Sequence, residues 1–188
     1  MRVIAGEAKG RRLLSVPGHT TRPIADRVKE SLFNILGDRV VDALFLDLFA
    51  GTGAVGIEAL SRGARGAVFV EASWKAVEVI RRNLEATALA DRAKVVRQDV
   101  FKFIRKQADI QFDIIYIAPP QHKGLWARTL RALDERALLA QDGLAIAQIH
   151  PKEYEVLNLR TLRLVDQRRY GSTLLCFYAP INKDLSTS

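Results

Sequence analysis

The residues best suited to chemistry form a glycine-rich turn, Gly51-Thr52-Gly53-Ala54-Val55-Gly56, after an apolar stretch. Residues 43–48 predict a buried strand and a helical pattern begins near Ala54, so the glycines lie at a strand-to-helix turn. Gly51 and Gly53 let a ligand approach the backbone, and the free N–H groups of the helix start point at the same place. The spacing predicts a nucleotide-like cofactor, either S-adenosylmethionine or NAD/FAD, with a ligand-free tight turn as the remaining alternative.

Three carboxylates lie at the carboxyl ends of the first three predicted strands: Asp47 and Glu71 end theirs, and Asp99 follows the third. Parallel strands place their carboxyl ends at one edge of a sheet, so we expect the three acids to face one crevice. Glu71 lies 20 residues after Gly51 and can accept both hydroxyls of a ribose. Asp99 can accept an adenine amine, with Val100 and Phe101 as apolar cover. Each acid alone also suits a helix N-terminus, but three at successive strand ends predict a binding site.

The fourth predicted strand, residues 112–118, runs into Pro119 and Pro120. Two prolines cannot continue a strand ladder or freely start a helix, so they predict an extended, rigid loop whose carbonyls stay unpaired. Rigid carbonyl acceptors suit a planar amine, whereas a hydride-transfer site has no particular use for them. The loop therefore favours an amino-methyltransferase over a dinucleotide-dependent oxidoreductase.

The charge of the chain is unevenly distributed. The 188 residues carry a formal net charge of +8, and residues 1–30 hold seven Lys or Arg against three Asp or Glu, which is half of the excess. Such clustering predicts a polyanionic partner, nucleic acid foremost, with a solvated basic surface as the alternative. The length suits one domain, and 48% hydrophobic residues suit a folded globular protein.

Several kinds of protein are excluded by what the sequence lacks. No apolar stretch approaches the roughly 20 residues of a membrane span, and the N-terminus has no signal-peptide pattern. The single cysteine, Cys176, lies in an apolar run that predicts a buried thiol, and three scattered histidines do not make a zinc site. We therefore expect a cytoplasmic protein without a metal.

The apolar periodicity predicts an α/β fold. Residues 2–5 and 11–15 are expected to form a basic β-hairpin, followed by an amphipathic helix over residues 24–36 whose Arg27 and Lys29 face solvent or a ligand. Further strands are predicted over 43–48, 66–71, 94–98, 112–118 and 143–149, with helices from Ala54, over 73–86, over 100–106 and over 126–133. Residues 162–170 and 173–178 predict a terminal β-hairpin around Gly171-Ser172.

At this point the sequence resembles a known family, the RsmD-type bacterial small-subunit (16S) ribosomal RNA guanine-N2 methyltransferases. The resemblance spans nearly the whole chain and rests on residues 1–6, Lys9-Gly10-Arg11, Thr21-Arg22-Pro23, residues 27–34, 47–53 and 56–64, and Tyr170-Gly171. It implies a class I S-adenosylmethionine-dependent methyltransferase fold: a Rossmann-like, mostly parallel open sheet of seven strands with an antiparallel last strand. It also implies an N-terminal extension over 1–38 with the basic hairpin and helix, a methyltransferase domain over 39–182 and a disordered tail over 183–188.

The resemblance also implies roles for individual residues. Asp47, Phe49, Gly51 and Gly53 would hold the methionine and ribose part of S-adenosylmethionine, Glu71 the ribose hydroxyls, and Asp99 and Val100 the adenine. The basic extension would bind RNA and close over the cofactor, through Arg2, Lys9, Arg11, Arg12, Arg22 and Arg27. The implied partner is small-subunit ribosomal RNA or an assembling 30S subunit, and we expect a monomer.

The sequence departs from the family at the catalytic loop. The family motif has Asp or Asn, two prolines, then Tyr or Phe, whereas this chain has Ala118, Pro119, Pro120 and Gln121. In the usual motif the acid or amide accepts a hydrogen bond from the target amine and the ring stacks on the base. Two alternatives therefore stay open: a weakly active or inactive RNA-binding assembly factor that still binds the cofactor, or an amino-methyltransferase acting on DNA adenine or protein glutamine.

Overall fold

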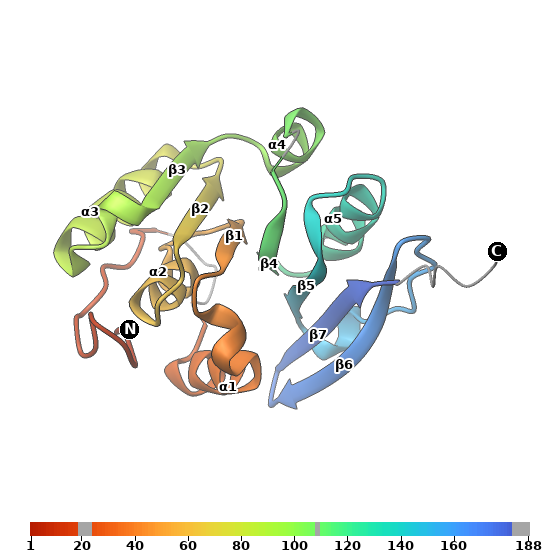
Figure 1. Ribbon diagram of the computed structural model, residues 1–188, viewed down its shortest axis with the longest axis horizontal. Coiled ribbons are helices and arrows are strands. Elements are labelled where there is room, and N and C mark those ends of the chain that lie inside the picture. The colour runs from red at the N-terminus through yellow and green to blue at the C-terminus, as the bar shows by residue number, and fades with distance from the viewer. Residues whose placement is uncertain (19–23, 108–109, 182–188) are drawn as a thin grey trace.

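A computed structural model describes residues 1–18, 24–107 and 110–181, and its centre is a seven-stranded sheet with helices on both faces (Figure 1). The strands are β1 (Leu44–Leu48), β2 (Gly66–Glu71), β3 (Ala93–Arg97), β4 (Phe112–Ile117), β5 (Leu139–Ile149), β6 (Leu162–Tyr170) and β7 (Thr173–Pro180). Their order is β3-β2-β1-β4-β5-β7-β6, and β7 runs antiparallel to both of its neighbours while β1 to β5 are parallel. The expected sheet, with its antiparallel last strand, is confirmed.

Five α-helices cover the two faces of the sheet: α1 (Asp26–Leu36), α2 (Ala54–Ser61), α3 (Trp74–Thr87), α4 (Val100–Lys106) and α5 (Leu125–Asp134). Alternate residues of each strand point to opposite faces. Phe45 and Tyr116 pack with α1, α2 and α3, whereas Leu46 and Ile115 pack with α4 and α5. The chain therefore folds into three layers around two apolar cores.

The order of the strands predicts a ligand-binding position at β1. The chain passes from β1 outward to β2 and β3, then returns to β4 on the other side of β1. In open α/β sheets a ligand binds outside the strand carboxyl ends where the order reverses in this way. The glycine turn, which joins β1 to α2, lies at that point.

The expected N-terminal hairpin is only partly formed. Arg2 and Arg12 make a single antiparallel bridge, and no extended strands follow from it. The reason lies in α2, where the Glu58 carboxylate accepts hydrogen bonds from the backbone N–H groups of Ile4 at 2.9 Å and Ala5 at 3.0 Å. Residues 1–3 and 10–13 still make three backbone hydrogen bonds, Val3 to Arg11, Gly10 to Val3 and Leu13 to Met1. The donors that follow Val3, however, go to the helix instead of extending the ladder. The segment 1–14 is a strap bound to α2 rather than a free-standing hairpin.

Most other boundaries agree with the sequence to within one or two residues. The main exception is β5, which begins at Leu139 instead of Gly143, beside a register shift between Phe112 and Ile114 of β4. Cys176 is buried as expected. Arg22, Pro23 and the expected tail over 183–188 lie outside the described residues. Of the helices described, none has the length and apolar character needed to cross a membrane.

Candidate cofactor and substrate site

The glycine turn is half-buried at Gly51, whereas Gly53 is buried against Ile80 and Phe69. Phe49, the first residue after β1, has a φ of 60°, and Gly51 has a φ of 58°. A Cβ built on Gly51 would meet nothing closer than 4.0 Å, whereas one on Gly56 would lie 2.4 Å from the ring of Phe69. Gly56 is therefore required for the packing of α2 on the sheet, and Gly51 leaves open space where a ligand can approach. Positive φ at a non-glycine residue such as Phe49 is strain of the kind that functional sites retain.

Glu71 fixes the shape of this turn. Its Oε2 atom accepts a hydrogen bond from the backbone N–H of Gly51 at 2.9 Å, and its Oε1 atom accepts one from Ser73 at 2.9 Å. Each carboxylate oxygen has a second lone pair, and the residue is only half-buried. The side chain expected to hold a ribose diol thus also joins the carboxyl end of β2 to the glycine turn.

Asp47 lies beneath the turn rather than in open solvent. The residue is 2% exposed, and its Oδ2 atom accepts a hydrogen bond from the N–H of Gly56 at 3.0 Å. Burial raises the pKa of Asp47 to about 8, against the lowering effect of the Gly56 hydrogen bond and with a further increase from the charge of Glu71. On β4, Tyr116 is opposite Asp47, and its hydroxyl donates to Gln148. Asp47 therefore supports the turn from the sheet side.

The third strand end supplies a helix cap and apolar contacts. The exposed Asp99 accepts a hydrogen bond from the N–H of Lys102 at 2.9 Å, so one carboxylate oxygen caps α4. Val100 is 3% exposed and packs into the core with α4. Next to it, Phe101 makes an edge contact with Phe49, with ring centroids 6.4 Å apart. The second and third strand ends thus converge on the turn after β1.

The loop after β4 lies next to that turn. The N–H of Ala118 donates to the carbonyl of Leu48 at 3.3 Å, which extends the pairing of β4 with β1 by one residue. Pro119 is buried and Gln121 is exposed in a turn. His122, with a φ of 61°, donates its backbone N–H to the Glu153 carboxylate at 2.7 Å. This bond ties the end of the loop to the segment after β5.

Among the described residues, no side chain or backbone N–H donates to the carbonyl oxygens of Pro119 and Pro120. The two prolines hold the chain extended, as the sequence predicts, and keep these acceptors fixed in direction. Residues 118–121 thus bring to the strand ends a pair of rigid carbonyls, without a side-chain acceptor at position 118 and without a ring at position 121.

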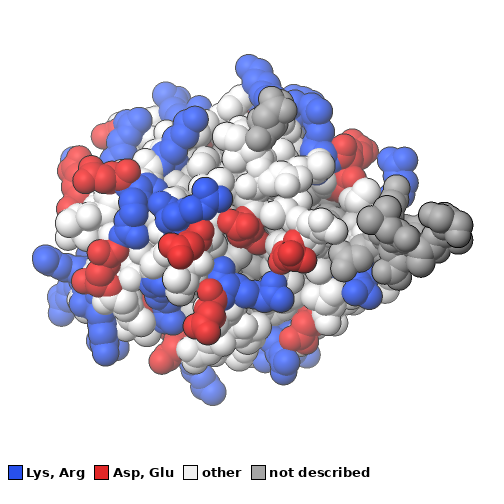
Figure 2. Space-filling model, viewed as in Figure 1, with Lys and Arg blue, Asp and Glu red and all other residues white. Residues whose placement is uncertain are grey.

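The described basic residues predicted to bind RNA are all exposed. They are Arg2, Lys9, Arg11, Arg12 and Arg27. Arg2 forms an exposed ion pair with Asp26 at 3.7 Å, which is worth little in water. Over the face drawn in Figure 2, Lys and Arg side chains are widely spread, with Asp and Glu among them. The basic character of the N-terminal strap is therefore one part of a broadly cationic surface.

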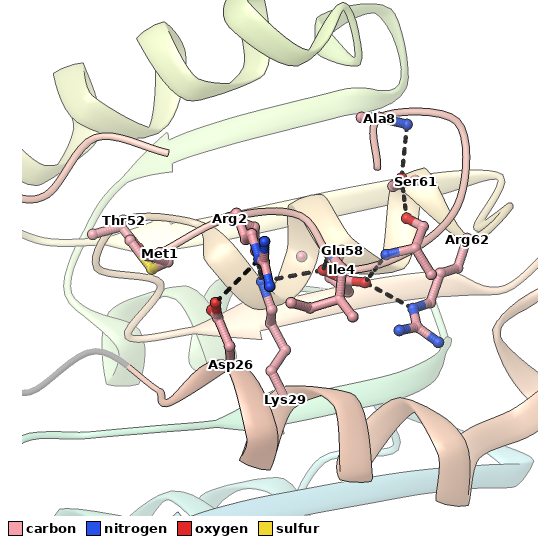
Figure 3. A network of polar contacts seen from close by, with 12 residues as sticks. Met1, Arg2, Ile4, Ala8, Asp26, Lys29, Thr52, Glu58, Ser61 and Arg62 are labelled. Carbon is pink, nitrogen blue, oxygen red and sulfur yellow. Dashed lines mark hydrogen bonds and ion pairs between the residues drawn. The ribbon is translucent and has the colours of Figure 1, made fainter. Parts of the chain in front are cut away.

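The expectation that Lys29 faces solvent or a ligand is wrong. Its side chain is 0% exposed and forms an ion pair with Glu58 at 3.1 Å, while its Nζ atom also donates to the carbonyl of Arg2 at 2.6 Å. Glu58 receives a second cation, Arg62, at 2.8 Å (Figure 3). Because the apolar face of α1 carries Lys29 into the interior, its charge needs a buried partner. The pair and the two N–H bonds from the strap form one clamp, Lys29–Glu58.

A second set of contacts joins the strap to the glycine turn. Asn83 of α3 is 0% exposed, accepts a hydrogen bond from the N–H of Leu14 at 2.7 Å and donates to the Leu14 carbonyl at 3.2 Å. The same amide donates to the Thr52 carbonyl at 2.9 Å. At the other end of the strap, the Thr52 hydroxyl donates to the sulfur of Met1 at 3.6 Å (Figure 3). Both ends of the strap thus contact the turn proposed for the cofactor.

The sequence did not predict the roles of Glu58 and Asn83, although the position of Glu58 in its helix indicates a buried partner. Glu58 is the lone charged residue in α2, whose other residues are apolar or small. A single acid in such a helix indicates a buried partner, here supplied by Lys29. Asn83 lies among alternating charged and apolar residues of α3, and nothing in its surroundings distinguishes it from a surface amide.

A hollow lies at the opposite end of the sheet from this edge. It has a volume of about 290 Å³, and its lining includes Asp42, Asp113 and Asp142 near the amino ends of β1, β4 and β5.

Comparison with known proteins agrees with this geometry. Residues 1–179 match the model of the family described as "Conserved hypothetical protein 95". The chain is 38% identical over 181 residues to "Putative rRNA methyltransferase YlbH" of Bacillus subtilis, covering 95% of this chain and 98% of that protein. It is 39% identical over 144 residues to ribosomal RNA small subunit methyltransferase D of Escherichia coli K12, covering 77% and 72%.

A solved structure shares the whole architecture. The structure of "Putative methyltransferase yhhF" from Escherichia coli superposes with a TM-score of 0.85 at 33% identity, covering 96% of this chain and 97% of that one. The match includes the antiparallel end of the sheet as well as the nucleotide-binding half. The chain belongs to the RsmD-type family of ribosomal RNA small-subunit methyltransferases.

Proposed function

We propose that this protein transfers a methyl group from S-adenosylmethionine to the exocyclic N2 amine of a guanine in small-subunit ribosomal RNA. The observation that carries the proposal is the meeting of two features at one edge of the sheet: a glycine turn open to a ligand, and two rigid proline carbonyls beside it. Relatives named as small-subunit ribosomal RNA methyltransferases support the class of substrate.

The glycine turn fits the cofactor. The open space around Gly51 admits a ligand to the backbone, and Glu71 keeps lone pairs for a ribose diol while it holds the turn. In the first turn of α2 the N–H of Gly56 is taken by Asp47, and among the described residues those of Ala54 and Val55 have no acceptor, which suits the carboxylate of the methionine part. The cofactor supplies an electrophilic methyl group on a sulfonium.

At the other side of the crevice, the chain orients the nucleophile. The carbonyls of Pro119 and Pro120 can accept hydrogen bonds from a planar amine, which directs its lone pair toward the methyl carbon. The N–C bond forms as the C–S bond breaks, S-adenosylhomocysteine leaves, and the amine loses a proton to solvent. The protein contributes position and exclusion of water rather than a charged catalyst.

The experiment is methyl transfer from tritiated S-adenosylmethionine to three substrates in parallel: small ribosomal subunits from bacteria that lack the gene, unmethylated DNA, and total protein from the same cells. The proposal predicts label in the ribosomal RNA alone. Label in DNA adenine or in protein glutamine would replace it with the corresponding amino-methyltransferase.

A second candidate function is favoured by Ala118 and Gln121, which lack the acceptor and ring of the family motif. The protein would then bind the cofactor and RNA during subunit assembly with little or no turnover. Losing one positioned acceptor costs about 10²–10³-fold in rate. Ala118→Asn therefore separates the two: a large increase in turnover marks an impaired enzyme, whereas no response with intact cofactor binding marks a binding protein.

A further inference from the structure

Beside the loop after β4, Arg128 stacks on Phe101, which Phe49 contacts at its edge, and none of the roles described above uses Arg128. Phe101 lies between the other two: its ring contacts Phe49, and the guanidinium carbon of Arg128 lies 3.8 Å from its ring centroid. That distance is well within the range of a cation–π contact. The aromatic pair is therefore followed by a positively charged group.

Phe49, Phe101 and Arg128 border the proposed crevice because each follows the carboxyl end of a strand. Phe49 is the first residue after β1, and Phe101 lies in the first turn of α4, two residues after Asp99. Arg128 lies in the first turn of α5, which begins just after the loop over residues 118–124. The three side chains thus connect the glycine turn to the loop that orients the amine.

Burial and charge show which of the three side chains is available. Phe101 is 8% exposed, so its ring is covered on both sides, whereas Arg128 is exposed. In the described part of the chain, no carboxylate lies within ion-pair distance of Arg128, and its side chain donates no hydrogen bond. Arg128 is thus an exposed cation that packs on an aromatic ring and has no polar partner for its side chain among the described residues. Such an arginine can serve as a surface for a nucleobase, because unstacked RNA bases stack on guanidinium planes as well as on rings.

We propose that the Arg128 guanidinium, packed over the ring of Phe101, is the surface on which the target base stacks, in place of the ring that Gln121 does not provide. The inference rests on the proposed function and assigns it a base-binding residue. The positive charge of Arg128 also suits the approach of an RNA backbone. Gln121 itself is exposed and offers no π-face.

The test compares Arg128→Ala and Arg128→Lys with wild type in methyl transfer to small ribosomal subunits, with S-adenosylhomocysteine affinity by calorimetry and thermal melting on the same preparations. Lysine keeps the charge but loses the plane. We expect both variants to lose roughly 5- to 150-fold in kcat/KM for RNA, the range for losing one stacked base, with cofactor affinity unchanged. Arg131→Ala, one turn further along α5, is the matched control and should change kcat/KM by less than about threefold.

A rescue experiment adds a second criterion. Gln121→Tyr restores a ring at the position where the family has one, so combining it with Arg128→Ala should recover most of the lost kcat/KM. Full activity of Arg128→Lys, or no rescue by Gln121→Tyr, would overturn the stacking role. Absence of methyl transfer in wild type as well would refute the proposed function itself, so the two failures are distinguishable.

Discussion

Replacing Glu58 by Gln tests how the N-terminal strap is held. Glu58 accepts hydrogen bonds from Ile4 and Ala5 and pairs with two cations, and its side chain is 0% exposed. An amide has a single acceptor oxygen, and its NH₂ group would point toward other donors. The substitution therefore leaves Lys29 buried at 0% exposure without a counter-charge, with the carbonyl of Arg2 and at most one amide oxygen as neutral partners.

The magnitude follows from the burial of the pair. Removing one partner of a buried ion pair costs about 3–5 kcal/mol, because the remaining charge is left uncompensated. For a domain of this size, that lowers Tm by about 6–20 °C. The matched control is Glu78→Gln, which removes an exposed ion pair with Arg81 at 2.7 Å and should cost less than about 1 kcal/mol.

The assay is urea unfolding of both variants, with limited trypsin digestion under native conditions. Because the strap carries Lys9, Arg11 and Arg12, its release should expose early cleavage sites in Glu58→Gln but not in Glu78→Gln. RNA affinity should fall in parallel with strap release while the folded core remains intact. Equal stability of the two variants, with no early cleavage, would refute the argument that the Lys29–Glu58 clamp holds the strap.

Three further predictions concern the crevice. Glu71→Ala should weaken S-adenosylhomocysteine binding at least about tenfold by calorimetry, because it removes the acceptor for Gly51 and for the ribose; unchanged affinity would contradict the assignment. Asn83→Ala should lower RNA affinity and cofactor affinity together, since the amide joins Leu14 to the glycine turn, and a loss confined to one ligand would argue against coupling. Burial raises the pKa of Asp47 to about 8, so between about pH 4 and pH 8 the folded protein keeps a proton on this carboxyl that the unfolded chain has released. The free energy of unfolding should therefore fall by up to about 1.4 kcal/mol per pH unit as pH rises through this range. Asp47→Asn should abolish that slope in urea titrations: it should match wild type near pH 4 and exceed it at pH 8, and a parallel pH dependence of the two proteins would contradict the role of burial.

The strands and helices of the nucleotide-binding half were predictable because each signal there is local. Ser73 precedes α3 and caps it with a hydrogen bond from Ala76, and the apolar run over 112–118 forms β4. The glycine spacing and the strand-end acids also follow local rules. These features need no knowledge of distant contacts.

The N-terminal strap could not be predicted in the same way. Its conformation depends on Glu58, more than 50 residues away, which takes the backbone donors that a hairpin would use. The burial of Lys29 follows from the same contact. The role proposed for Arg128 could not be predicted from the sequence either. It depends on the contact between Arg128 of α5 and Phe101 of α4, which are 27 residues apart in the chain.

The most direct test of the central claim is nucleoside analysis of small-subunit ribosomal RNA after methylation in vitro. Subunits from bacteria lacking the gene are incubated with the protein and tritiated S-adenosylmethionine, and the RNA is digested and separated by chromatography. The account predicts that the label elutes as N2-methylguanosine. Label in any other nucleoside, or no label under conditions in which the protein binds S-adenosylhomocysteine, would contradict it.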